Sequence, residues 1–200
     1  MKHVIFDLGG VLIDWDPALA FADVFTDRAA AEAWMERIGF PAWNRLQDGG
    51  RSFAAGLAAA RAEHGDAARH LEGYLAGFPL TIEKTIPGSW EIAEALLARN
   101  VALYAITNWA AETWPHALEL HPRLGSLFAD IVVSGQVGAL KPAPAIFRLL
   151  MDRNGLLPAD CIFVDDSPAN VEGARALGMD GIHFTDAEAL GAELARRGLF

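Results

Sequence analysis

Cysteine is nearly absent from this sequence, which has only Cys161 in 200 residues. A single cysteine excludes an intramolecular disulfide, so the chain must fold without one. The residues that follow it, Ile162, Phe163 and Val164, are β-branched or aromatic. Because this composition is typical of a buried strand, we expect a structural thiol at this position and not a reactive one.

Positive charge is also scarce. The chain has 16 lysines and arginines against 26 aspartates and glutamates, which gives a formal net charge of −10. A negative surplus repels nucleic-acid phosphates and anionic membrane surfaces, so we expect neither as a partner. An anionic ligand would therefore need a local cluster of positive groups or a metal ion.

The N-terminal stretch lacks the features of a targeting segment. It carries one lysine, and Asp7 interrupts its apolar run. A run interrupted in this way is neither a signal peptide nor a membrane span. We therefore expect a cytoplasmic protein, and the residues indicate no particular oligomeric state.

Apolar residues, in contrast, are abundant. Hydrophobic residues make up 52% of the chain and charged residues only 21%. Such a composition can bury a large core and excludes wholesale disorder. The length predicts one domain, with room for an inserted subdomain.

Short apolar runs rich in β-branched residues alternate with helical segments along most of the chain. The first run ends at Asp7, and Gly9 and Gly10 then let the chain turn sharply and approach a ligand. Further strands are predicted at 101–106, 131–133, 162–164 and 181–184, and helices at 90–99, 111–120, 143–154, 168–177 and 186–197. The alternation predicts an α/β fold with a doubly wound, Rossmann-like parallel sheet.

The segment between the first two strands contains no convincing strand. Its alanine-rich stretches predict helices at 17–25, 28–38, 52–63 and 67–77. We therefore predict a small helical insertion at 14–84 and a main domain formed by 1–13 and 85–200. A loop is predicted at 39–50, where Trp43 and Asn44 are candidate substrate contacts, although a helix packed on its neighbour would explain the same residues.

Polar residues follow the predicted strands at the points where each strand ends or the next helix begins. They are Asp7, Thr107, Asn108, Lys141, Asp165 and Asp166. Because the carboxyl ends of parallel strands meet at one edge of the sheet, we expect these side chains to converge. Three carboxylates at close range need a cation, and Mg²⁺ suits them. A carboxylate nucleophile, a metal ion held by carboxylates and a fixed ammonium group are the groups that phosphoryl transfer requires.

These residues belong to four motifs that occur in a fixed order. The motifs are Asp7-Leu8-Gly9-Gly10-Val11, Thr107-Asn108, Lys141-Pro142 and Asp165-Asp166-Ser167-Pro168-Ala169-Asn170. In this order they resemble the motifs of the haloacid-dehalogenase-like hydrolase superfamily. The resemblance covers the whole chain, including a helical cap inserted after the first motif.

The resemblance implies a role for each of these residues. Asp7 would be a nucleophile that forms an aspartyl intermediate, and Thr107 and Lys141 would hold the transferred group. Asp165 or Asp166 would bind Mg²⁺ together with Asp7 and the backbone carbonyl of Gly9. Apart from what the resemblance implies, we expect the substrate, a small phosphate ester, to contact Gly9, Gly10, Asn108, Trp43 and Asn44.

Within the superfamily the chain is similar to the glucose-1-phosphate phosphatase branch. The similar features are the Asp-Leu-Gly start, the pair Asp14 and Asp16, the Trp114-Pro115 segment after Thr107-Asn108, and Asn170-x-Glu172-Gly173-Ala174. This similarity implies a sugar phosphate as one possible substrate.

One departure from the superfamily concerns Gly9. Most phosphatases of the superfamily have there a second aspartate that acts as general acid and base, which contributes roughly 10²–10⁴-fold to the rate. Three interpretations stay open: a slow or inactive phosphatase, a substrate whose leaving group needs little protonation, or another proton donor. Asp14, Asp16, a cap residue and a water are the candidate donors.

Two other functions are consistent with parts of the sequence. The 2-haloacid dehalogenases of the superfamily also lack that aspartate and use an arginine of the cap, for which Arg37 and Arg45 are candidates. However, Asp165 and Asp166 would repel a carboxylate substrate unless a metal ion lies between them. The third hypothesis is a catalytically weak homologue that keeps the fold and the site to bind a ligand.

Overall fold

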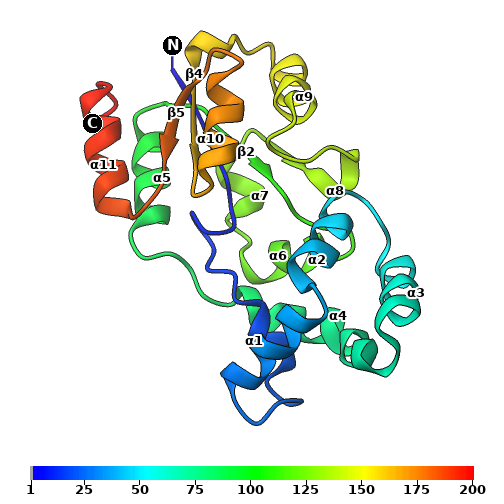
Figure 1. Ribbon diagram of the computed structural model, residues 1–200. Coiled ribbons are helices and arrows are strands. Elements are labelled where there is room, and N and C mark those ends of the chain that lie inside the picture. The colour runs from blue at the N-terminus through cyan, green and yellow to red at the C-terminus, as the bar shows by residue number, and fades with distance from the viewer. Residues whose placement is uncertain (1) are drawn as a thin grey trace.

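Five parallel strands form the central sheet of the computed structural model, which describes residues 2–200 (Figure 1). They are β1 (His3–Phe6), β2 (Leu103–Thr107), β3 (Asp130–Val133), β4 (Cys161–Asp165) and β5 (Asp180–His183). Their order is β3-β2-β1-β4-β5. All five strands were predicted, and the boundaries shift by one or two residues.

Both faces of the sheet are covered by helices, as the doubly wound prediction requires. The helices of this part are α5 (Ser89–Ala98), α6 (Trp114–Leu120), α7 (Leu124–Leu127), α8 (Ser134–Val137), α9 (Pro144–Asn154), the 3₁₀ helix η4 (Pro158–Asp160), α10 (Pro168–Arg175) and α11 (Ala187–Arg196). Val4 and Phe6 belong to the apolar cluster that contains residues of α5, α7 and α11. Ile5 lies in the other cluster, with residues of α9 and α10. This alternation follows from the two-residue period of a strand.

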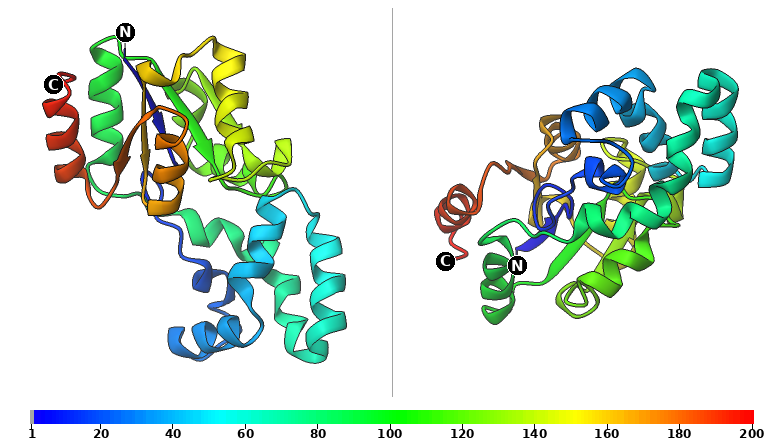
Figure 2. Two further views of the ribbon diagram at one scale, coloured as in Figure 1. Left: turned by 45° about the horizontal axis from the view of Figure 1, so that its top comes forward. Right: turned by 90° about the horizontal axis from the view of Figure 1, so that it is seen from below.

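The segment between β1 and α5 contains only helices among its regular elements. They are η1 (Pro17–Phe21), α1 (Arg28–Arg37), α2 (Phe40–Asp48), α3 (Phe53–His64), η2 (Gly65–Gly73), α4 (Tyr74–Gly77) and η3 (Phe78–Ile82). Figure 2 shows this helical group beyond the carboxyl ends of the strands. Aromatic side chains form its centre, with Tyr74 in ring contact with Phe21, Phe40, Trp43, Phe53 and Phe78.

The two connections into the helical segment run side by side. Ile13 pairs with Thr85 in an antiparallel bridge. On either side of it the Asp14 amide donates to the Lys84 carbonyl (3.0 Å) and the Ile86 amide to the Leu12 carbonyl (3.0 Å). The insertion therefore leaves and rejoins the sheet at neighbouring points, and the division into domains at 13/14 and 84/85 stays a prediction.

The predicted loop at 39–50 is wrong, because residues 40–48 form helix α2. Gly39 has a left-handed φ of 62° and Pro41 lies in the first turn, so both residues mark a helix start and not a loop. The predicted helix at 67–77 is also wrong in type, since most of it is the 3₁₀ helix η2. No helix among residues 2–200 is both long and apolar enough to span a membrane.

Candidate active site

The turn after β1 places Asp7 at the edge of the sheet. The Asp7 amide donates to the Val164 carbonyl (2.8 Å) and so continues the pairing with β4 by one residue. Its carboxylate Oδ1 accepts from the Leu8 amide (2.7 Å). The chain then closes a tight turn in which Gly10 donates to the Ile13 carbonyl (2.8 Å). The side chain of Asp7 is therefore fixed at the carboxyl end of the central strand.

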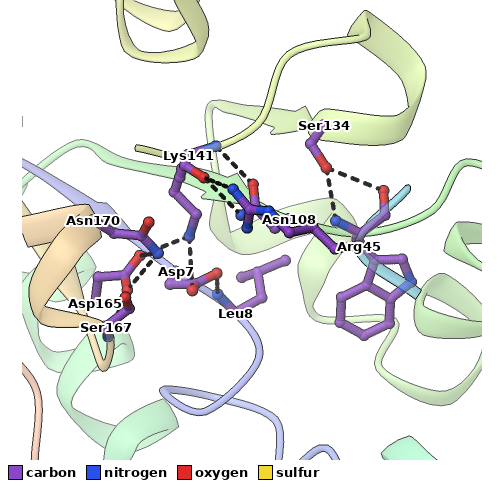
Figure 3. A network of polar contacts seen from close by, with 10 residues as sticks. Asp7, Leu8, Arg45, Asn108, Ser134, Lys141, Asp165, Ser167 and Asn170 are labelled. Carbon is purple, nitrogen blue, oxygen red and sulfur yellow. Dashed lines mark hydrogen bonds and ion pairs between the residues drawn. The ribbon is translucent and has the colours of Figure 1, made fainter. Parts of the chain in front are cut away.

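Lys141 is the positive charge of this site, and its side chain is fully buried. Its Nζ lies 2.7 Å from Asp7 Oδ2 and 2.7 Å from Asp165 Oδ2, between the two carboxylates (Figure 3). The Lys141 backbone is held by Asn108, whose Oδ1 accepts from the Lys141 amide (2.9 Å) and whose Nδ2 donates to its carbonyl (3.2 Å). Asn108 therefore positions the lysine, in addition to its predicted place beside the substrate.

The neighbouring residues Asp165 and Asp166 have different surroundings. Asp165 is fully buried, and its Oδ1 accepts from the Ser167 amide (2.8 Å) while Asn170 Nδ2 donates to both of its oxygens (3.0 and 3.1 Å). Asp166 is exposed and lines the cavity described below. Asp165 thus anchors Lys141, and Asp166 is the one of the pair that an ion in the cavity can reach.

Helix α10 begins at Pro168, as predicted, and Ser167 precedes it at the N-cap position. However, the Ser167 hydroxyl makes no capping hydrogen bond, and its amide serves Asp165 instead. The start of α10 thus contributes to the acidic site through a backbone donor.

The acidic cluster carries more negative charge than Lys141 balances. Asp7, Asp165 and Asp166 each offer an oxygen within 4.8 Å of the others. Burial raises the pKa of Asp7, an effect that Lys141 opposes and Asp165 reinforces. Burial and then the charge of Asp165 also raise the pKa of Asp166. Three carboxylates and one ammonium leave a net charge of −2 when ionised, and oxygen ligands with this charge fit Mg²⁺.

Gly10 lets the backbone approach Asp166. It has a φ of 75°, and a Cβ at this position would lie 2.5 Å from Asp166 Oδ2. Gly10→Ala should therefore cost about 1–3 kcal/mol of unfolding free energy, because the backbone is strained and Asp166 must move. At Gly9 a Cβ would meet nothing within 4 Å. Gly9→Ala is the matched control for urea unfolding, and an equal loss in both variants would contradict this account of the turn.

A cavity of about 290 Å³ opens over these residues. It is lined by Asp7, Gly9, Gly10, Asp14, Trp15, Asn44, Asp48, Phe78, Thr107, Asn108, Trp109, Thr113 and Asp166. Lys141 and Asp165 lie directly behind Asp7 and are fully buried. The structure thus brings the predicted catalytic and metal-binding residues together at one sheet edge.

Trp43 is the predicted site residue that the structure places elsewhere. It is buried among the aromatic residues of the helical segment, and its Nε1 donates to the Gly56 carbonyl (2.9 Å). Its prediction as a substrate contact is wrong, because its indole completes the packing of α2 on α3. Asn44, one residue further on, does line the cavity.

Sequence reasoning missed Asp48 and Phe78 as cavity residues. Asp48 lies four residues after Asn44 on α2, so both share one face of the helix. The four-residue spacing could have identified Asp48 as a cavity residue. It was not used, because residues 39–50 were predicted to be a loop and not a helix. Phe78 comes from η3, the last helix of the insertion.

Known proteins are similar to this chain over most of its length. The model of the haloacid dehalogenase-like hydrolase family matches residues 1–178. A phosphoglycolate phosphatase of Rhodospirillum rubrum is 33% identical over 89% of this chain and 77% of its own length. A sesquiterpene phosphatase of Aspergillus oryzae is 28% identical over 96% of this chain and 94% of its own length.

Two further comparisons concern a plant enzyme and a solved structure. A flavin mononucleotide hydrolase of Arabidopsis thaliana is 31% identical over 57% of this chain, which spans only 46% of that relative. The structure of a haloacid dehalogenase family enzyme of Bacteroides thetaiotaomicron, solved with magnesium and inorganic phosphate, aligns with a TM-score of 0.67. The alignment covers 93% of this chain and 95% of that one at 20% identity, so it shows a shared fold.

Proposed function

Because this chain belongs to the haloacid dehalogenase-like hydrolases, we propose that it is a Mg²⁺-dependent phosphatase of a small phosphorylated metabolite. The observation that carries the proposal is the position of Asp7. Its carboxylate lines the cavity, while its oxygens are held by Leu8 and Lys141 and face two further carboxylates. The phosphatases among the relatives support the same reaction class.

In the proposed reaction Asp7 attacks the phosphorus atom and forms an aspartyl-phosphate. Lys141 favours the ionised form of this carboxylate, against the effect of burial, and adds positive charge beside the phosphoryl oxygens. Thr107, at the end of β2, lines the cavity and supplies a hydroxyl donor to the same oxygens. Asp7, Asp166 and the Gly9 carbonyl would hold Mg²⁺, which would offset the charge of the phosphoryl group.

We further propose that the leaving group is uncharged. Apart from Asp7 and Asp166, the cavity is lined by two more carboxylates, Asp14 and Asp48, and by no arginine or lysine among the described residues. A second anionic group on the substrate would therefore meet repulsion. Trp15, Phe78 and Trp109 offer flat apolar surfaces for the body of a sugar or another neutral alcohol.

The helical segment at 14–84 acts in this proposal as a cap that selects the substrate. It supplies Trp15, Asn44, Asp48 and Phe78 to the cavity. The dehalogenase alternative requires a cap arginine there, but Arg45 is exposed and donates to the Lys141 carbonyl (3.3 Å). Arg37 is exposed as well and does not line the cavity.

A panel of substrates with and without the metal tests the proposal. Phosphate esters with neutral and anionic leaving groups, together with L-2-haloacids, would each be assayed with Mg²⁺ and with EDTA. We expect phosphate release from esters of neutral alcohols, little release from phosphoglycolate, and loss of activity in EDTA. Halide release, or phosphate release that is unchanged in EDTA, would contradict the proposed reaction.

A further inference from the structure

The site as described lacks a proton donor for the leaving alcohol. Gly9, two residues after Asp7, has no side chain that could give a proton. Its missing side chain leaves open space, since a Cβ would meet nothing within 4 Å. Gly9 itself lines the cavity. A carboxyl group from another element can therefore serve the same space.

We propose that Asp48, the last residue of α2, is the general acid and base of this site. The proposal rests on the phosphatase function proposed above. Asp48 lines the cavity that Asp7 also lines. Its carboxylate Oδ2 accepts from Asn44 Nδ2 (3.1 Å), and it also accepts from the backbone N–H of Ala110.

Asp48 is held against the main domain, although it belongs to the helical segment. Its carbonyl accepts from the Ser134 hydroxyl (2.6 Å), and that hydroxyl in turn accepts from the Trp109 amide (2.9 Å). Trp109 and Ala110 directly follow Thr107 and Asn108. The backbone and the carboxylate of Asp48 are thus both tied to the loop that carries the phosphate-binding threonine.

The surroundings of Asp48 suit a group that both gives and takes a proton near neutral pH. Burial raises the pKa of Asp48 to about 7, although the positive charge of Arg45 opposes this shift. Tyr74, on α4, faces it from the helical segment, and the charge of Asp48 adds to the burial that raises the pKa of Tyr74. The carboxylates of Asp7 and Asp166 line the same cavity. A catalytic acid or base works best when its pKa lies near the working pH.

The two half-reactions then balance. In the first, Asp7 forms a bond to phosphorus, the bond from phosphorus to the ester oxygen breaks, and the protonated Asp48 gives its proton to that oxygen. In the second, the Asp48 carboxylate takes a proton from water as the water oxygen attacks phosphorus. The bond from phosphorus to Asp7 breaks, phosphate leaves, and Asp48 is protonated again.

The test compares Asp48→Asn on two esters that differ in their need for protonation. For a primary-alcohol sugar phosphate we expect kcat/KM to fall by about 10²–10⁴-fold. For p-nitrophenyl phosphate, whose leaving group departs without a proton, we expect a fall of about tenfold or less. The variant should also release nitrophenolate in a burst, because the loss of the base slows hydrolysis of the phosphoenzyme. Equal losses on both esters would overturn the role of Asp48.

Asp14→Asn is the matched control, because Asp14 is the other carboxylate of the cap segment in the cavity. The proposal would be wrong if the loss of kcat/KM in Asp14→Asn depended on the leaving group and the loss in Asp48→Asn did not. Asp14 would then be the proton donor. Adding Gly9→Asp to Asp48→Asn places an acid in the open space beside Asp7. We expect this double variant to regain activity on the sugar phosphate.

The parent enzyme supplies a measurement that needs no variant. Its kcat/KM for the sugar phosphate should decline as the pH rises above about 7, because Asp48 then loses the proton that it must give. The decline should be absent for p-nitrophenyl phosphate, and the same decline for both esters would count against Asp48.

Failure of the proposed function has a different signature. It would show as absence of phosphate release by the parent enzyme or as full activity of Asp7→Asn, and either result would remove the basis for Asp48 as well. An active parent with an inactive Asp7→Asn keeps the phosphatase assignment, whatever Asp48→Asn does.

Discussion

Asp7→Asn should reduce phosphate release by on the order of 10⁴–10⁶-fold, as the loss of a catalytic nucleophile does in other enzymes. An amide cannot attack phosphorus, but it has the size and shape of the carboxylate. Its oxygen can still accept from the Leu8 amide, which now donates to Asp7 Oδ1 (2.7 Å). The loss should therefore appear in kcat with no loss of folding. The measurement is phosphate release in Mg²⁺ beside a urea unfolding curve.

The unfolding curve separates a chemical loss from a structural one. Burial raises the pKa of Asp7, so the folded protein disfavours its charge at neutral pH, and the neutral amide removes that cost. We expect the variant to be at least as stable as the parent. Asp152→Asn, an exposed change on α9, is the matched control and should keep the parent activity. Activity of Asp7→Asn near that of the control would show that Asp7 is not the nucleophile.

Lys141→Met should reduce both stability and turnover. The buried ammonium is within 2.7 Å of an oxygen of Asp7 and of Asp165, so its removal leaves two carboxylates without their positive partner. Breaking a buried ion pair in this way costs about 3–5 kcal/mol. Phosphate release should fall as well, because the transferred group loses the ammonium beside Asp7. Urea unfolding in EDTA and steady-state kinetics in Mg²⁺ measure the two effects.

The stability deficit of Lys141→Met should depend on pH in a defined direction. Without the ammonium, which lowers the pKa of Asp7 in the parent, the folded state favours protonated Asp7 more strongly than the parent does. The folded variant then binds more protons than the unfolded chain, so its stability falls as the pH rises. The deficit should thus be larger at about pH 8 than at about pH 5, and a deficit that shrinks with rising pH would contradict the charge account.

A double variant tests whether Lys141 and Asp165 act as a pair. Asp165→Asn in the Lys141→Met background removes one of the unpaired charges, so it should recover part of the lost unfolding free energy. If the double variant instead lost the sum of the unfolding free energies lost by Lys141→Met alone and by Asp165→Asn alone, the two residues would not be coupled. Such additivity would contradict the role of Lys141 as the counter-ion of this cluster.

The sheet and its acidic edge were predictable from the sequence for a simple reason. Short β-branched runs next to Asp7, Thr107 and Asp165 define strand ends, and parallel strands bring their carboxyl ends to one edge. In the structure Phe6 lies opposite both Ala105 and Val164, so Asp7, Asp165 and the end of β2 lie at a similar level of the sheet. The local residue pattern and the parallel topology were therefore sufficient to predict the sheet and its acidic edge.

The insertion was harder to predict, because its residues are placed by contacts between distant segments. Trp43 has the composition of a ligand contact, but its ring is buried against Phe40, Phe53 and Tyr74. Asp48 reaches the cavity because Ser134, 86 residues later in the chain, holds its backbone. Helical spacing places Asp48 on the same face as Asn44 but cannot reveal which surface that face meets, so Trp43 was predicted at the site and Asp48 was missed.

The central claim is that Asp7 carries the phosphoryl group during turnover. Its most direct test is acid quenching of the enzyme during the reaction with p-nitrophenyl phosphate, followed by mass spectrometry of the peptide that contains Asp7. We predict one phosphoryl group on Asp7 in Mg²⁺, and none in EDTA or in Asp7→Asn. A phosphoryl group on any other residue would contradict the account.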